Sequence, residues 1–189
     1  MKTVATVLDR PIARSFGVAL TFTVLTACLA QAAVRLPFTP VPVTLQVLGV
    51  ILSGLVLGSR LGALAQLQYL ALGLAGAPVF AGAMGGPAVL LGPSGGYLPG
   101  FVAGAFLTGW LFERCPRPSI RNGFYAGMVG VAGIYICGAA WLSVWLTLVG
   151  TASPAVAAWI MGVLPFIGLD AVKVTLAAMI ASSIDNWKK

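Results

Sequence analysis

The charged residues of this chain stand far apart, and the positions between them are mostly apolar. Four runs contain no Asp, Glu, Lys or Arg: 15–34, 36–59, 61–112 and 122–169. A helix that crosses a bilayer needs about 20 mostly apolar residues. The pattern therefore predicts an all-α integral membrane protein with six transmembrane helices, at about 15–34, 43–58, 61–76, 97–112, 123–149 and 155–183.

Two connections between these helices are rich in proline and glycine and, apart from Arg35, lack charge. The segment 37–42 has three prolines in six residues, and proline cannot continue a helix. The segment 76–96 contains seven glycines and three prolines. Irregular backbone near membrane depth is tolerated where it is buried in protein or lines a cavity. We therefore expect both connections to fold over a site, although ordinary turns are the simpler alternative.

Composition supports a single membrane domain over residues 1–189. The chain is 59% hydrophobic and 8% charged, whereas soluble domains carry about 25% charged residues. The first apolar run, at 15–34, follows Lys2, Arg10 and Arg14. It is longer than the apolar stretch of about 7–15 residues in a cleaved signal peptide. We therefore expect it to be the first transmembrane helix.

Lysine and arginine are divided unevenly between the connections, which alternate across the membrane in a six-helix arrangement. The 1–2, 3–4 and 5–6 connections contain only Arg35. The termini, the 2–3 turn and the 4–5 loop contain nine basic residues: Lys2, Arg10, Arg14, Arg60, Arg114, Arg117, Arg121, Lys188 and Lys189. Because cytoplasmic connections carry the excess of Lys and Arg, both termini are predicted to be cytoplasmic. The two proline- and glycine-rich connections are then outside.

Asp170 and Lys173 are exceptions to this pattern, because they lie in the middle of the last apolar segment. A charge at the bilayer centre costs about 2.5–3.5 kcal/mol on insertion scales and usually marks a functional site. Residues three apart share a helix face. We interpret the pair as part of a ligand site; the alternative is that the two charges only tether helices. Pro165 and Gly168, just before the pair, predict a kink or local unwinding.

Other function classes find little support in the residues. The net charge of +7 is scattered at segment ends and forms no dense basic stripe with aromatics, so we expect no nucleic-acid partner. The chain has no histidine and three widely spaced cysteines, which disfavours a metal cofactor or an enzyme. The segment 92–97 resembles a phosphate-binding loop but lacks its lysine. Energy for any transport would come from another subunit or from an ion gradient.

Small residues four apart predict close helix packing. The pairs Gly100–Gly104 and Gly123–Gly127, and the series Gly54, Gly58 and Gly62, follow this spacing. We expect packing within the chain, with a homo-oligomer seam as the alternative. Ala19, Thr23 and Ala27 form a further small-residue face, which we expect to be available to a partner helix.

Three motifs, in this order, resemble those of the BioY family, the biotin-specific S components of energy-coupling factor transporters. They are PFTPVPVTLQ at 37–46, LGPSGGYL at 91–98 and DAVK at 170–173. The resemblance implies a multi-pass protein of the bacterial cell membrane. It implies that the chain binds biotin as a transported substrate and works with a membrane coupling subunit and cytoplasmic ATPase subunits. The family's Ala-xxx-Ala docking face is matched here only by Thr23 and Ala27.

The resemblance also implies a set of ligand-binding residues. They are Asp170, Lys173, Thr44, Gln46, Ser94, Gly95, Gly96 and Tyr97. Asp170 suits a ureido N–H of biotin, and Lys173 suits either its carboxylate or its ureido oxygen. The neutral residues would add hydrogen bonds, and the glycines would let the backbone approach the ligand.

Two rival interpretations remain at this point. One is a stand-alone secondary carrier for biotin or another small organic anion, with Asp170 as a proton site. The other is a membrane scaffold in which the charge pair is purely structural.

Overall fold

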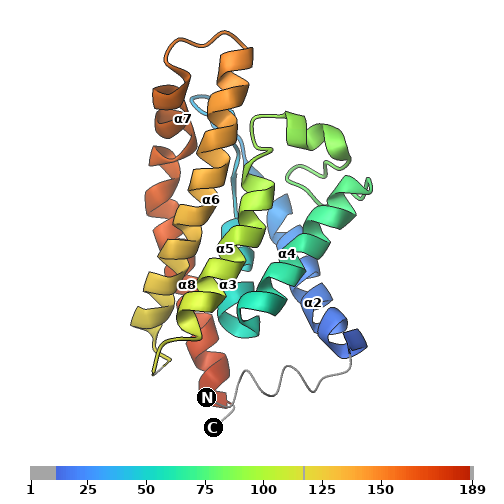
Figure 1. Cartoon of the computed structure of the whole chain (residues 1–189), viewed down its shortest axis with the longest axis vertical. Coiled ribbons are helices and arrows are strands. Elements are labelled where there is room, and N and C mark those ends of the chain that lie inside the picture. The colour runs from blue at the N-terminus through green and yellow to red at the C-terminus, as the bar shows by residue number, and fades with distance from the viewer. Residues whose placement is uncertain (1–11, 117, 188–189) are drawn as a thin grey trace.

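The structure is a computed structural model that describes residues 12–116 and 118–187. Helices dominate it, and the only paired strands in the described part form a short antiparallel sheet with two residues in each strand (Figure 1). The elements are α2 (Ile12–Gln31), β1 (Ala33–Val34), β2 (Val43–Thr44), α3 (Gln46–Leu57), α4 (Ser59–Leu74), the 3-10 helix η1 (Pro87–Leu91), α5 (Tyr97–Phe112), α6 (Ile120–Leu148), α7 (Pro154–Gly162) and α8 (Leu164–Trp187).

The connections gather at two opposite ends of the helical bundle (Figure 1). At one end, called the base here, α2 begins, α8 ends and the α3–α4 and α5–α6 turns lie. At the other end, called the loop end, lie the segments 32–45, 75–96 and 149–153. Among the described basic residues outside the charge pair, Arg60, Arg114 and Arg121 are at the base, and Arg35 is at the loop end. The remaining terminal basic residues and Arg117 lie outside the part of the chain or the side chains that the structure describes.

The helices follow the apolar segments with shifted bounds. By length and composition, two stretches of the described chain can cross a membrane, Ile120–Leu148 and Pro154–Ile184. Three shorter apolar helices are Ser15–Gln31, Gln46–Leu57 and Tyr97–Phe112. The greatest difference from expectation is in the segment 155–183, which forms two helices instead of one.

The turn between α3 and α4 is a single residue, Gly58, with a φ of 82°. A positive φ of this kind is open to glycine at little steric cost. Ser59 therefore belongs to α4, although the sequence placed it in the turn. The carboxylate of Glu113, just after α5, accepts from the Ser59 backbone N–H at 2.8 Å and from its hydroxyl at 2.9 Å. This side chain satisfies an N–H that the first turn of a helix leaves unpaired.

The last apolar segment breaks at Val163, between α7 and α8. Pro165 has no N–H to give to the carbonyl four residues earlier, which belongs to Met161. Thr39 supplies the missing donor, because its hydroxyl lies 2.7 Å from the Met161 oxygen. The hydroxyl of Tyr97 donates in the same way to the Gly162 carbonyl at 2.8 Å. The predicted interruption near Pro165 is thus present, and two side chains from distant segments satisfy it.

Glycines bring the helices close together within the chain. A Cβ at Gly54 would strike the Ala105 carbonyl of α5, and one at Gly127 would strike Val174 of α8. Gly104 meets Ile134 and the backbone of α6 in the same way. These contacts confirm that the small-residue spacings serve packing within the chain.

The small-residue face of α2 is also used internally, so the expectation that it is available to a partner helix is wrong. Ala19 and Thr23 are 0% and 1% exposed. The Thr23 hydroxyl lies 2.8 Å from the Ala65 carbonyl of α4. This face of α2 is therefore packed against α4. The outward face of α2 carries larger side chains instead, including Phe16, Leu20 and Val24.

Candidate ligand-binding cavity

A cavity of about 960 Å³ lies in the loop-end half of the bundle. Its walls come from both irregular connections and from residues of α3, α5, α6 and α8. Cavities that hold small molecules have volumes of about 300–1,000 Å³ and mostly apolar walls with a few placed polar groups. The proline- and glycine-rich connections thus line a cavity of this size, and we expected them to fold over a site.

The space for this cavity exists because α3 is short. Its 12 residues span only about 18 Å at 1.5 Å per residue. A helix does not extend back through residues 40–45, where bends and the short strand β2 lie instead. The prolines at 40 and 42 prevent that helix. Thr44, in β2, and Gln46, the first residue of α3, both line the cavity.

The charge pair on α8 forms the most polar part of the wall. Asp170 and Lys173 are 2% and 6% exposed, and both line the cavity. The Lys173 Nζ lies 2.6 Å from Asp170 Oδ1. The hydroxyl of Tyr135, on α6, donates to Asp170 Oδ2 at 2.7 Å. Each carboxylate oxygen thus already accepts one bond, and lone pairs remain for a ligand.

Lys173 retains capacity to donate to a ligand. An ammonium group carries three N–H donors, and its contact with Asp170 is the one that Lys173 makes among the described residues. The pair together carries no net charge. This part of the wall can therefore accept from an N–H and donate to an oxygen of the same neutral ligand group.

Four of the six neutral residues that we expected to bind the ligand line the cavity, and two do not. Thr44, Gln46, Ser94 and Tyr97 line the cavity with the charge pair. The hydroxyl proton of Tyr97 is already directed to the Gly162 carbonyl, so toward a ligand Tyr97 offers its ring and an acceptor oxygen. The amide of Gln46 is held by hydrogen bonds on both sides.

Gly95 and Gly96 do not line the cavity. A Cβ at Gly95 would strike the Leu90 carbonyl, and one at Gly96 would strike Trp141 of α6. The Trp141 indole N–H donates to the Gly92 carbonyl at 2.8 Å. The close approach that these glycines allow is thus between the loop and α6, whereas we expected an approach to the ligand.

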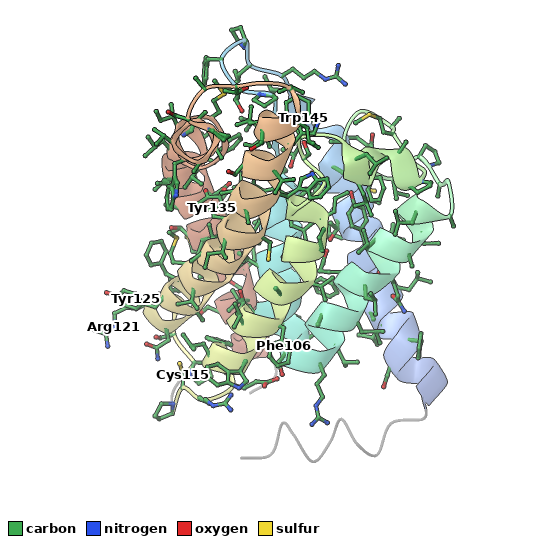
Figure 2. The ribbon with its side chains drawn as sticks, turned by 45° about the horizontal axis from the view of Figure 1, so that its top comes forward. Phe106, Cys115, Arg121, Tyr125, Tyr135 and Trp145 are labelled. Carbon is green, nitrogen blue, oxygen red and sulfur yellow. The ribbon has the colours of Figure 1, made fainter. Side chains whose placement is uncertain are left out.

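Two polar residues at the cavity were not among the predicted site residues. Tyr135 lies near the middle of α6 (Figure 2), and nothing in the sequence separates it from Tyr125, which is 61% exposed. Arg35 lines the cavity with an exposed side chain, and its guanidinium is close to Gly82. The sequence did carry a signal for Arg35, because it is the only charge between positions 15 and 59.

Comparisons with known proteins find relatives over most of the chain. A protein from Thermotoga maritima named biotin transporter BioY is 40% identical over 148 residues, 78% of this chain and 83% of that protein. A protein from Pyrococcus horikoshii named probable biotin transporter BioY is 41% identical over 174 residues, 92% of this chain and 98% of that protein.

The fold has a counterpart among solved structures. The crystal structure of an S-component for biotin from an ECF-type ABC transporter superposes with a TM-score of 0.80 and 28% sequence identity. The match covers 92% of each chain. The BioY family's sequence model matches residues 1–189. The chain therefore belongs to the BioY family.

Proposed function

We propose that this chain is the biotin-binding membrane subunit of an uptake transporter, and that coupling and ATPase subunits energise it. Relatives that match most of the chain are named biotin transporters, and the solved neighbour is a biotin S-component. The observation that carries the proposal is the buried group of Asp170, Lys173 and Tyr135 on the wall of a cavity of about 960 Å³.

The chemistry of biotin fits this wall. Its ureido ring is neutral, with two N–H donors and one carbonyl acceptor. Asp170 accepts from a ureido N–H and Lys173 donates to the ureido oxygen. This assignment leaves the buried pair neutral as a whole, so no net charge is added at depth, where an unpaired charge is costly.

The other parts of biotin then extend toward the loop end. Phe101, Phe166 and Val41 provide apolar wall for the thiophane ring and the valeryl chain. The ligand carboxylate needs a cation, and Lys173 is already paired. Arg35 lines the cavity and, among the described residues, forms no ion pair with an acidic side chain. We assign the ligand carboxylate to Arg35.

The orientation in the membrane follows from the two ends of the bundle. We propose six passes in the bacterial cell membrane, with both termini and the base in the cytoplasm. The described basic residues at the base support this assignment, since cytoplasmic connections carry the excess of Lys and Arg. The cavity then opens to the outside, where an uptake system must capture its substrate.

The partners would contact a different surface from the one suggested by the sequence. Because α4 covers Ala19 and Thr23, the outward side of α2 is the part left for a coupling subunit. The solved neighbour comes from an ECF-type ABC transporter, and ATPase subunits belong to that type of assembly. This agrees with the glycine-rich segment 92–96, which lacks a nucleotide-binding lysine after its last glycine.

The direct test is binding of radiolabelled biotin to the purified full chain in detergent, without other subunits. We expect saturable binding at one site per chain that excess unlabelled biotin removes. Asp170→Asn should lose most of it while the protein remains folded. Failure of the unmutated, folded chain to bind biotin at any concentration tested would overturn the proposal.

A further inference from the structure

A chain of hydrogen bonds connects the cavity wall to the segment 76–86. The Thr44 hydroxyl donates to Gln46 Oε1 at 2.8 Å. Gln46 Nε2 donates to the Tyr69 hydroxyl at 2.7 Å. The Tyr69 hydroxyl donates to the Val79 carbonyl at 3.0 Å. Thr44 and Gln46 line the cavity, but Tyr69 does not.

The direction of every bond in this chain follows from its last member. The Val79 carbonyl can only accept, so Tyr69 must use its single proton there. Tyr69 must then accept from Gln46, which requires the amide nitrogen on that side. The amide oxygen consequently faces Thr44, which must donate. One amide N–H of Gln46 remains for an acceptor atom in the cavity, because an amide nitrogen carries two.

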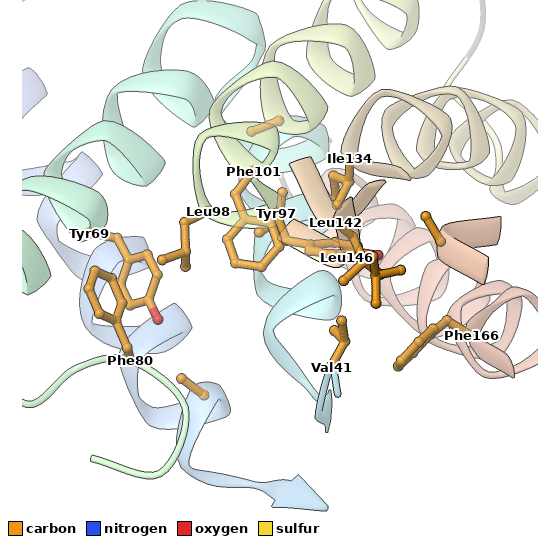
Figure 3. Packing of buried hydrophobic residues seen from close by; sticks show 14 residues of the cluster. Val41, Tyr69, Phe80, Tyr97, Leu98, Phe101, Ile134, Leu142, Leu146 and Phe166 are labelled. Carbon is orange, nitrogen blue, oxygen red and sulfur yellow. The ribbon is translucent and has the colours of Figure 1, made fainter. Parts of the chain in front are cut away.

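The segment 76–86 is held at the same place by apolar contacts. Phe80 is 1% exposed and fills the space beside Gly73, where a Cβ would strike its ring. The rings of Phe80 and Tyr69 pack edge to face, with their centroids 5.5 Å apart (Figure 3). Gln31, at the end of α2, accepts from the Ala83 N–H at 3.0 Å. Tyr69 therefore contacts this segment through both its ring and its hydroxyl.

We propose that Tyr69 is a positioning residue that fixes the amide of Gln46 with its N–H toward the ligand, and does so only while the segment 76–86 is seated. The proposal rests on the proposed function for the identity of the ligand, biotin. Its structural part stands on the hydrogen bonds alone. When the segment leaves its place, Tyr69 loses the acceptor that fixes its proton, and the Gln46 amide is free to turn. Ligand contact and loop seating are linked in this way through a residue that does not touch the ligand.

The structural part can be tested in the ligand-free chain by hydrogen exchange of the segment 76–86. Tyr69→Phe keeps the ring and removes the hydroxyl, and we expect exchange there to rise about three- to tenfold. Tyr125→Phe is the matched control, because Tyr125 is 61% exposed. It should leave exchange unchanged. Equal protection of the segment in Tyr69→Phe and the unmutated chain would overturn the proposal.

Two changes at Gln46 test the direction of the bonds. Gln46→Glu, studied near pH 8, introduces a carboxylate that can only accept. Tyr69 would donate to it and release Val79, so exchange of 76–86 should rise as in Tyr69→Phe. In Gln46→Met, the Tyr69 hydroxyl still donates to the Val79 carbonyl, so the exchange of 76–86 should not rise. The same exchange in both variants would contradict the assigned direction.

Biotin release provides the functional measurement. Tyr69→Phe should speed dissociation about three- to tenfold, and this effect should shrink in a Gln46→Met background, since Tyr69 acts through that amide. Strictly additive effects would overturn the coupling. If the unmutated chain binds no biotin, the proposed function fails, and the exchange measurements still decide whether Tyr69 holds the loop and the amide.

Discussion

The two ends of the bundle are built from the same kinds of helices, yet one is closely packed and the other is hollow. Toward the base, the core of α3, α6 and α8 consists of aliphatic and alanine side chains, including Ile51, Val174 and Ala178. Toward the loop end, the core contains large aromatics, including Tyr97, Phe101 and Phe166. Tyr135 packs against both clusters and marks their boundary.

The difference shows how one small membrane protein separates stability from binding. Glycine and alanine let the helices approach near the base, which gains dispersion contacts where lipid offers no hydrophobic driving force. Near the loop end, prolines and the break between α7 and α8 interrupt the helices around the cavity, while α5 and α6 stay in close contact at Gly96 and Gly100. Substitutions in the two halves should therefore have different consequences, and each of the following experiments tests that separation.

The largest effect is expected at the charge pair. Lys173→Ala removes the charge-assisted bond that we propose to the ligand, and such a bond is worth about 1.5–3 kcal/mol, or about 10- to 150-fold in biotin affinity. It also leaves Asp170 without its cation. Lys173→Arg keeps the charge and should lose less. Titration of the two purified variants with biotin measures this, and equal affinities would show that the lysine does not meet the ligand.

A substitution in the packed half should have the opposite result. Gly127→Ala places a Cβ against Val174 and Ile51, and overpacking of this kind costs about 1–3 kcal/mol. Thermal unfolding in detergent should shift down by several degrees, while the biotin affinity of the folded protein stays the same.

Gly168→Ala is the control for Gly127→Ala, because an added Cβ at Gly168 meets nothing within 4 Å. Alanine is the better helix former, so this variant should be at least as stable as the unmutated chain. A loss of biotin affinity in Gly127→Ala at unchanged stability would break the division between the two halves.

The smallest effect is expected at the mouth of the cavity. Arg35 is exposed, and exposed ion pairs contribute about 0.2–1 kcal/mol. Arg35→Gln should therefore weaken biotin binding by about 1.4- to 5-fold, with less difference at high salt.

Biotin amide, which has no carboxylate, should bind equally well to the unmutated chain and to Arg35→Gln. Arg121→Gln, at the base, is the matched control and should not change the affinity for either biotin or biotin amide. If the amide and the acid respond alike to Arg35→Gln, the carboxylate is bound elsewhere.

The sequence predicted those features that depend on local pattern. Charge-free runs located the helices, and the bounds expected for α5 are those observed. The isolation of Asp170 and Lys173 in an apolar segment pointed to the wall of the cavity. The helix break was placed near Pro165 but lies at Val163, because a proline acts on the turn before it.

Features that depend on three-dimensional contacts could not be predicted in this way. Tyr135 and Tyr125 lie in the same apolar run, and only the packing of α6 against α8 separates the buried residue from the exposed one. The glycines at 95 and 96 were expected near the ligand, but the position of Trp141 decides which surface they approach. The face of α2 was assigned to a partner because the sequence does not say that α4 lies against it.

The hydroxyl of Thr39 replaces the N–H that Pro165 lacks, so movement of the segment 37–42 would change the solvation of the broken helix. If the segment containing Thr39 swings away, the Met161 oxygen loses the donor that it has within the described chain. A carbonyl without a hydrogen bond is strongly unfavourable in an apolar interior, so a water molecule must donate to the Met161 oxygen in place of Thr39. Displacement of the Thr39 segment and hydration of the broken helix are therefore one event.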